Sequence, residues 1–90
     1  DDEQYADATL SISQYLQLIR FVLRSDEALE RFKKRDLDFY FEHFCVPYSQ
    51  GTRVTIKAVA KEHKIVYGSL LNRVKPIKEF VRQKIRHFVT

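Results

Sequence analysis

Glycine and proline are scarce in this chain, and their scarcity restricts its fold more than any other feature of the sequence. Two Gly and two Pro in 90 residues are too few for the frequent tight turns of a β-sandwich or barrel. Apolar residues instead recur every three or four positions, which is the spacing of an amphipathic helix. We therefore expect one all-α domain over residues 1–90, a small bundle of four to five helices.

The first part of the chain, residues 10–46, has the pattern of an acidic, aromatic-rich support. Residues 1–9 are acidic and largely lack apolar periodicity, so we interpret them as an irregular lead-in. Ser11 or Ser13 is predicted to cap a helix over 14–24, because a hydroxyl accepts from the free amides of a first turn. The wide apolar stripe of this helix predicts either the central core helix or an interface with a protein partner. It comprises Tyr15, Leu16, Leu18, Ile19, Phe21, Val22 and Leu23.

A second helical segment is predicted over residues 26–45. Ser25 is its expected N-cap, and Leu29 is expected to point into the core. Asp36 is placed to cap again, so the segment is either one kinked helix or two short ones. The turn-forming residues of 46–52 then predict the clearest break in the chain.

Charge divides the chain into two unlike parts. Residues 1–50 carry six Lys or Arg against ten Asp or Glu, whereas residues 51–90 carry ten against two. A strongly basic segment beside an acidic one is typical of a nucleic-acid surface on a support. The competing interpretation is that these cations only solvate helix exteriors.

Residues 54–75 have the spacing of two short helices joined by a tight turn. Thr55 is the predicted cap of the first helix, and Ala60 is small enough to lie where two helices cross. Ile65 is predicted to fill the corner below the turn. The apolar positions of the two helices are Ile56, Val59, Ala60, Leu70, Leu71 and Val74.

The run VAKEHKI at residues 59–65 resembles the signature of helix-turn-helix proteins, including bacterial sigma factor region 4. Its continuation YGSLLNRVK, at 67–75, is similar to the pipsqueak and pogo-transposase type. The resemblance covers about 20 of the 90 residues. Lys64 stands at the turn position where Gly is usual, and a left-handed residue with a Cβ costs roughly 1 kcal/mol. The resemblance implies a DNA-binding module of a larger transcription, replication or transposition protein.

In a helix-turn-helix the second helix enters the major groove, which here places residues 67–74 against duplex DNA. Burial of Leu70 and Val74 would leave polar side chains of this helix facing outward. The expected base contacts are Ser69, Asn72 and Arg73, because Asn pairs with adenine and Arg with guanine through two hydrogen bonds. The expected phosphate contacts are Thr55, Lys57, Tyr67, Lys75 and Lys78. Leu71 is predicted to join the core or to touch a thymine methyl group.

Pro76 predicts a boundary after Lys75, because the residue before a proline is pushed out of helical geometry. The second helix would then end near Val74, and a last helix would begin at Pro76. Residues expected to face inward on it are Ile77, Phe80, Val81, Ile85, Phe88 and Val89, with Lys78, Arg82 and Arg86 on the other side. A helix in this place leaves no room for the β-hairpin wing of winged-helix proteins.

The sequence favours neither an enzyme nor a metal or cofactor site. Cys45 is the lone cysteine, and His43 lies two residues away, so the two would point to different sides of a helix. We expect a buried, inert thiol. Three His and one Cys match no zinc-ligand spacing. A lone cysteine cannot form an internal disulfide, which favours a reducing, intracellular setting, nucleus or bacterial cytoplasm. Neither a membrane span nor a signal peptide is apparent, and no small-molecule substrate is indicated.

The alternative function is a helical protein–protein interaction module of a larger assembly, contacting its partner through the helix over 14–24. The sequence lacks an initiating Met, which suggests a piece of a longer protein. Structured RNA shares the charge pattern, but the aromatic residues follow core spacing, which disfavours a stacking platform.

Overall fold

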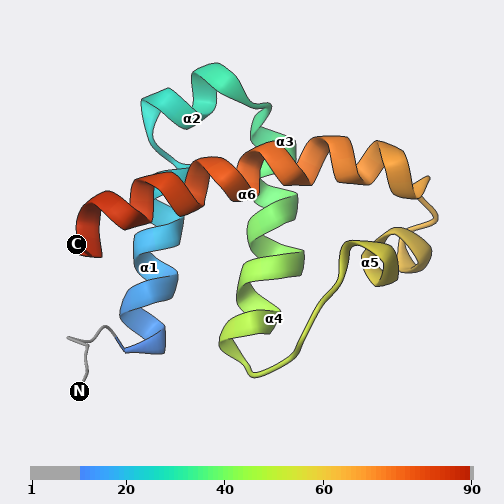
Figure 1. Ribbon diagram of the computed structural model, residues 1–90, viewed down its shortest axis with the longest axis horizontal. Helices are drawn as coiled ribbons and strands as arrows, with labels where there is room; N and C mark the ends of the chain where they lie inside the picture. Colours follow the sequence, from blue (N-terminus) through green and yellow to red (C-terminus); the bar gives the residue numbers. More distant parts are fainter. Residues whose placement is uncertain (1–10, 90) are drawn as a thin grey trace.

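The structure, a computed structural model, describes residues 11–89, and their side chains as far as His87. This part of the chain contains helices and connecting turns but no strand, which confirms the all-α prediction (Figure 1). The elements are α1 (Ile12–Leu23), α2 (Asp26–Arg31), α3 (Lys34–Tyr40), the π-helical η1 (Phe41–Cys45), α4 (Val46–Ser49), α5 (Ile56–Glu62) and α6 (Tyr67–Val89). Because α3, η1 and α4 follow one another without a break, the described residues form five helical rods. The lead-in over 1–9 lies outside the described residues.

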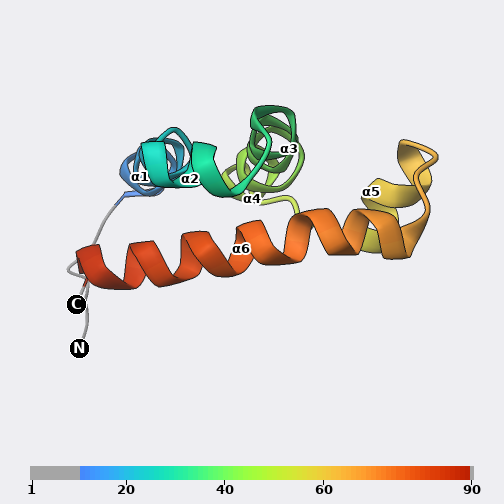
Figure 2. The same ribbon diagram turned by 90° about the horizontal axis from the view of Figure 1, so that it is seen from above.

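The central element is α6, which runs along the length of the molecule and crosses α1 and α3 (Figures 1 and 2). The packed helices α1, α2 and α3 lie on one side of it, and α5 contacts its N-terminal end. Its buried side chains, at the spacing of one helix face, are Leu70, Val74, Ile77, Phe80, Val81 and Ile85. The side chains of Phe88 and Val89, predicted to face inward, lie outside the described ones.

The predicted boundary at Pro76 is wrong, because α6 continues through it to Val89. An interior proline costs about 3 kcal/mol, since it removes the bond to the carbonyl four residues earlier, here that of Asn72. Both residues are exposed, so water can satisfy that carbonyl. Burying each large apolar side chain on the opposite face contributes roughly 1.5 to 3 kcal/mol, and six of them outweigh the proline.

The first helix is not the central core helix that its apolar stripe predicted. Ser11 caps it as expected, because the Gln14 N–H donates to Ser11 Oγ (3.1 Å) and the Ser11 N–H to Gln14 Oε1 (2.9 Å). Only one face of α1 is buried, through Ile19, Val22 and Leu23, whereas Phe21 is 65% exposed. The molecule is 17 Å thick, and a helix with its side chains is about 10 Å across. Two layers of helices therefore leave the outer face of α1 in solvent.

Residues 26–45 form two separate helical rods, which decides between the two predicted alternatives. Ser25 caps α2 as predicted, accepting from the Ala28 N–H (3.2 Å). Asp36 is not a cap, because α3 begins at Lys34 after two extended residues and has no side-chain cap. The predicted inward side chain of Leu29 is 46% exposed, since fully buried Ala28 holds the contact position and lets α2 approach closely.

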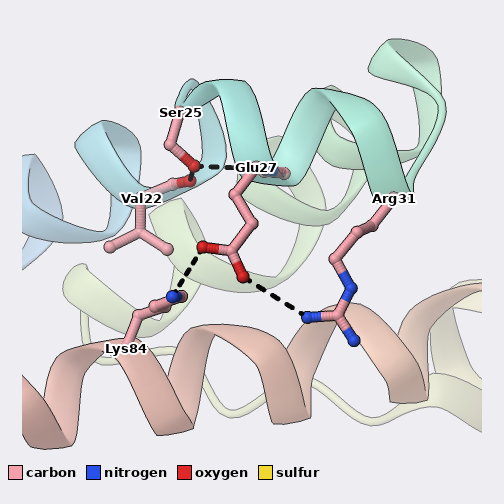
Figure 3. A network of polar contacts seen from close by, with 6 residues as sticks. Val22, Ser25, Glu27, Arg31 and Lys84 are labelled. Atoms are coloured by element: carbon pink, nitrogen blue, oxygen red, sulfur yellow. Dashed lines mark hydrogen bonds and ion pairs between the residues drawn. The ribbon is translucent and has the colours of Figure 1, made fainter.

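An ion-pair network connects α2 to the C-terminal half of α6 (Figure 3). The Glu27 carboxylate lies 2.6 Å from Lys84 Nζ and 3.6 Å from Arg31 Nη1. Its hydrogen bond to Lys84 and the two nearby cations lower the pKa of Glu27 below its usual value. Lys84, one of the ten Lys and Arg residues after residue 50, therefore stabilises the contact between α2 and α6.

The predicted break over 46–52 begins later than expected, because the helix continues through Pro47 to Ser49. The π-helical turn η1 lies directly before this proline, where Val46 N–H donates to the carbonyl of Phe41. This wider turn shifts the hydrogen-bond pattern before Pro47, so that the helix accommodates a residue without an N–H to donate. The helix ends at Ser49, and two residues later the chain turns at Gly51, whose φ of 83° is one that glycine adopts without strain.

No helix within residues 11–89 combines the length and the apolar content needed to cross a membrane.

Candidate nucleic-acid interface

The first helix of the predicted pair, α5, begins and packs as its residues predict. Thr55 is in extended conformation, and its Oγ1 accepts from the Ala58 N–H (3.1 Å), so it is the N-cap. Val59 and Ala60 are buried at the contact with the core and α6. The absence of a long side chain at Ala60 lets the two helices approach each other.

The turn between α5 and α6 spans residues 63–66 and is closed by a backbone bond. The Ile65 N–H donates to the carbonyl of Ala60 at 2.8 Å. Lys64 has a φ of 57°, the left-handed conformation expected at a position where Gly is usual. Ile65 is half-buried and packs against the core below the turn, as predicted.

Sequence reasoning missed an aromatic cluster that holds the C-terminal end of α5. The His63 ring lies 4.5 Å from the His43 ring and 5.2 Å from the Phe39 ring, measured between centroids. Phe39 and His43 belong to α3 and η1 and are themselves 4.5 Å apart. The aromatic character of His63, at a position that is usually apolar, was the available signal.

The second helix of the pair is the first two turns or so of α6. Leu70 and Val74 are buried there as predicted, and Leu71 is half-buried. Successive residues of a helix are rotated by about 100°, so Asn72 and Lys75 lie on the side facing away from the core. Both are exposed, and they form the protruding edge of α6.

One flank of this edge faces α3. Arg73 lines a shallow concavity of about 250 Å³ together with Arg35, Asp36 and Phe39. Ser69 precedes Arg73 by one turn and lies on the same flank. The three predicted base contacts therefore do not lie on one face of α6. Asn72 lies on the protruding edge, whereas Ser69 and Arg73 lie on the flank beside it.

The other flank borders a larger groove of about 890 Å³ between α6, α5 and α4. Four of the predicted phosphate contacts line it, namely Thr55, Lys57, Tyr67 and Lys78. Arg53, Arg82 and Arg86 line it too, although sequence reasoning did not assign them to the site. The spacing of Lys78, Arg82 and Arg86 by four was a usable signal, whereas nothing local marked Arg53. Lys75, the fifth predicted phosphate contact, lies on the protruding edge instead.

The cysteine lies in the wall of this groove and is a poor nucleophile. Burial raises the pKa of the Cys45 thiol to about 12, so the thiol stays protonated at neutral pH. It pairs with the hydroxyl of Tyr40, five residues earlier, across the π-helical turn. His43 turns instead to Phe39 and His63, so the two residues do not form a nucleophile–base pair.

Within residues 11–89, no group of three or more His, Cys, Asp or Glu side chains is placed to hold a metal ion. Comparison of the chain with models of known protein families, with curated protein sequences and with solved structures finds no match.

Proposed function

We propose that this chain binds duplex DNA through α5, the turn and the start of α6, which together act as a helix-turn-helix. One observation carries this proposal. The protruding edge of α6 has cations on both of its flanks, Arg35 and Arg73 on one and Lys57 and Lys78 on the other. A major groove is bounded by two phosphate strands, and a helix lying in it meets phosphates on both sides.

This proposal gives some of these residues other roles than those expected from the sequence. Asn72 and Lys75 lie deepest in the major groove of the DNA and read base edges, Asn72 by its two hydrogen bonds to adenine. Ser69 and Arg73 face one strand, where Arg73 reaches either a guanine or a phosphate. Lys57, Lys78 and the helix start at Thr55 hold the opposite strand, and these contacts fix the register without reading sequence.

Glu79 limits how much of α6 enters the groove. It lies one turn after Lys75 on the same edge and is exposed, so its carboxylate would face the bases or the phosphates of a deeper contact. The part of α6 that enters the DNA therefore ends before it. The remainder of the helix anchors the reading end to α1, α2 and α3.

The test begins with selection of a preferred site from randomised duplexes, followed by fluorescence anisotropy on that site and on a scrambled one. We expect binding that weakens steeply between 50 and 200 mM salt, because each neutralised phosphate releases counterions. Asn72→Ala should reduce the preference for the selected site by roughly 1 to 3 kcal/mol. Lys78→Ala should weaken both duplexes equally and lower the salt slope by about one.

Lys61→Ala is the matched control, because Lys61 is an exposed lysine of α5 that lines neither flank. It should change the affinity less than Lys78→Ala does. Duplex DNA would be rejected as the ligand if no binding occurred at about 50 mM salt, or if binding did not weaken between about 50 and 200 mM salt.

A further inference from the structure

The groove beside α6 continues into a second hollow of different chemistry. The second hollow, of about 690 Å³, lies between the start of α1 and the end of α4. The two share Tyr15, Ile19, Cys45, Tyr48 and Arg53, so they adjoin each other, and we treat them together as one channel. The residues that line the channel come from α1, α3, η1, α4, the loop after α4, α5 and α6. We name its two parts the apolar lobe, beside α1, and the basic lobe, beside α5 and α6.

The apolar lobe has large side chains at its rim that the fold leaves in solvent. Ile12 is 64% exposed and Tyr48 is 69% exposed, and both line the lobe with Leu16. Arg53 is the one cation among the described residues that line it. Contiguous exposed apolar side chains with a concave shape are typical of a surface that another chain covers.

The basic lobe carries cations that the fold does not neutralise. Arg53, Lys57, Lys78 and Arg82 line it and are exposed, and no described Asp or Glu lines it. None of these four forms an ion pair with a described carboxylate. Arg53 lies where the two lobes meet, since it lines both.

The channel walls are held in place by packing, which makes its shape a fixed feature. Tyr40, Phe44 and Cys45 line the basic lobe and come from α3 and the π-helical turn η1. Tyr40 and Cys45 are buried, and the Tyr40 and Phe44 rings are stacked at 5.7 Å between centroids. π-helical turns occur frequently at functional sites, and this one faces the channel.

We propose that the channel binds an acidic amphipathic peptide segment of another protein. Its apolar side chains would cover Ile12, Leu16 and Tyr48, and its carboxylates would meet Arg53, Lys57 and Arg82. An amphipathic helix laid in a hydrophobic groove is a common way of recognising a peptide. This proposal develops the interaction-module alternative and is independent of duplex binding.

The distribution of charge favours such a peptide over a single strand of nucleic acid. A nucleic-acid strand has one phosphate per nucleotide and needs cations along its whole path. The apolar lobe offers such a strand only Arg53 among its described lining residues. A peptide that is apolar at one part and acidic at another matches both lobes.

The test uses the full 90-residue chain and a fluorescein-labelled, helix-forming peptide of about 15 residues, with Leu and Phe in one half and Glu and Asp in the other to match the two lobes. Fluorescence anisotropy should show saturable binding. Ile12→Asp should weaken it about tenfold or more, because a carboxylate then replaces an apolar contact at the rim. This variant keeps its fold, since Ile12 is exposed and an acidic residue suits the first turn of a helix.

Arg53→Glu should also weaken peptide binding about tenfold, because it reverses a charge where the two lobes meet. Lys61→Glu is the matched control. It makes the same charge change at an exposed α5 residue that lines neither lobe, and it should change the affinity less than about twofold.

Three outcomes would overturn the proposal. Equal losses for Arg53→Glu and Lys61→Glu would indicate diffuse attraction between opposite charges. Undiminished binding by Ile12→Asp would exclude the apolar lobe. A labelled oligothymidine that bound more tightly than the peptide and lost affinity with Arg53→Glu would assign the channel to a nucleic-acid strand.

The two proposals fail separately. Asn72→Ala should leave peptide binding unchanged, and Ile12→Asp should leave duplex binding unchanged, because these residues lie on different surfaces. Lys57 and Lys78 belong to both surfaces, so saturating peptide should displace a duplex if both proposals hold.

Discussion

The helices α1 and α6 show that the proportion of apolar residues does not determine which helix becomes central. Helix α1 is the more apolar of the two by sequence, yet Ile12, Tyr15 and Phe21 on it remain exposed. Helix α6 carries six of the ten cations found after residue 50, yet it contacts α1, α3 and α5. Helix α1 also contacts several elements, namely α2, η1, α4 and α6, but it buries only three of its side chains. The longer α6 buries six large apolar side chains along one continuous face. The length and the position of α6 therefore make it the central helix of this fold.

The largest expected effect compares one substitution at two isoleucines. Ile77, in α6, is 1% exposed, whereas Ile12, in α1, is 64% exposed. Ile77→Ala should lower the free energy of unfolding by about 2 to 5 kcal/mol, because it leaves a cavity in the core. Ile12→Ala should change it by about 0.5 kcal/mol or less. Urea denaturation of both variants gives the difference, and equal losses would contradict the central position of α6.

A second substitution tests whether packing carries α6 through its proline. Pro76→Ala restores an N–H donor for the carbonyl of Asn72 at a solvent-exposed position. We expect a gain of about 2 kcal/mol in the free energy of unfolding: the helix-propensity difference of about 3 kcal/mol, less the added freedom of the unfolded chain. Thermal unfolding followed by circular dichroism measures this gain. A destabilised variant would show that α6 is bent or interrupted in solution.

The smallest effect concerns the ion pairs between α2 and α6. The pKa of Glu27 is lowered in the folded protein, so its contribution to stability is present above its usual pKa of 4.5. That contribution is lost as the pH falls below 4.5 through the lowered value. Glu27→Gln should therefore reduce the stability slightly at pH 7 and flatten its decline in acid. Denaturation midpoints measured from pH 7 to pH 3 test this, and parallel curves for the two proteins would contradict it.

Local chemistry made several features of the fold predictable from sequence. The three caps Ser11, Ser25 and Thr55 each accept a hydrogen bond from the amide three residues ahead, so they depend only on neighbours in the chain. The left-handed Lys64 followed from its position in the turn pattern. These features depend on neighbours in the chain, which a sequence displays directly.

The wrong predictions share a physical cause. Pro76 and Pro47 were both expected to end a helix, and in both places the helix continues. The preference of a proline is local, while the burial and the π-helical turn that override it depend on the surrounding structure. Arg53 was missed for the same reason, because only the folded chain brings this loop residue beside Tyr48 and Lys57.

The continuity of α6 past Pro76 has a mechanical consequence. At about 1.5 Å per residue, its 23 residues make a lever about 35 Å long. Because the helix is continuous, a force applied to its protruding N-terminal part tilts its C-terminal half against α1 and α2. A displacement of α6 caused by binding at one end is therefore transmitted to the helices packed at its other end.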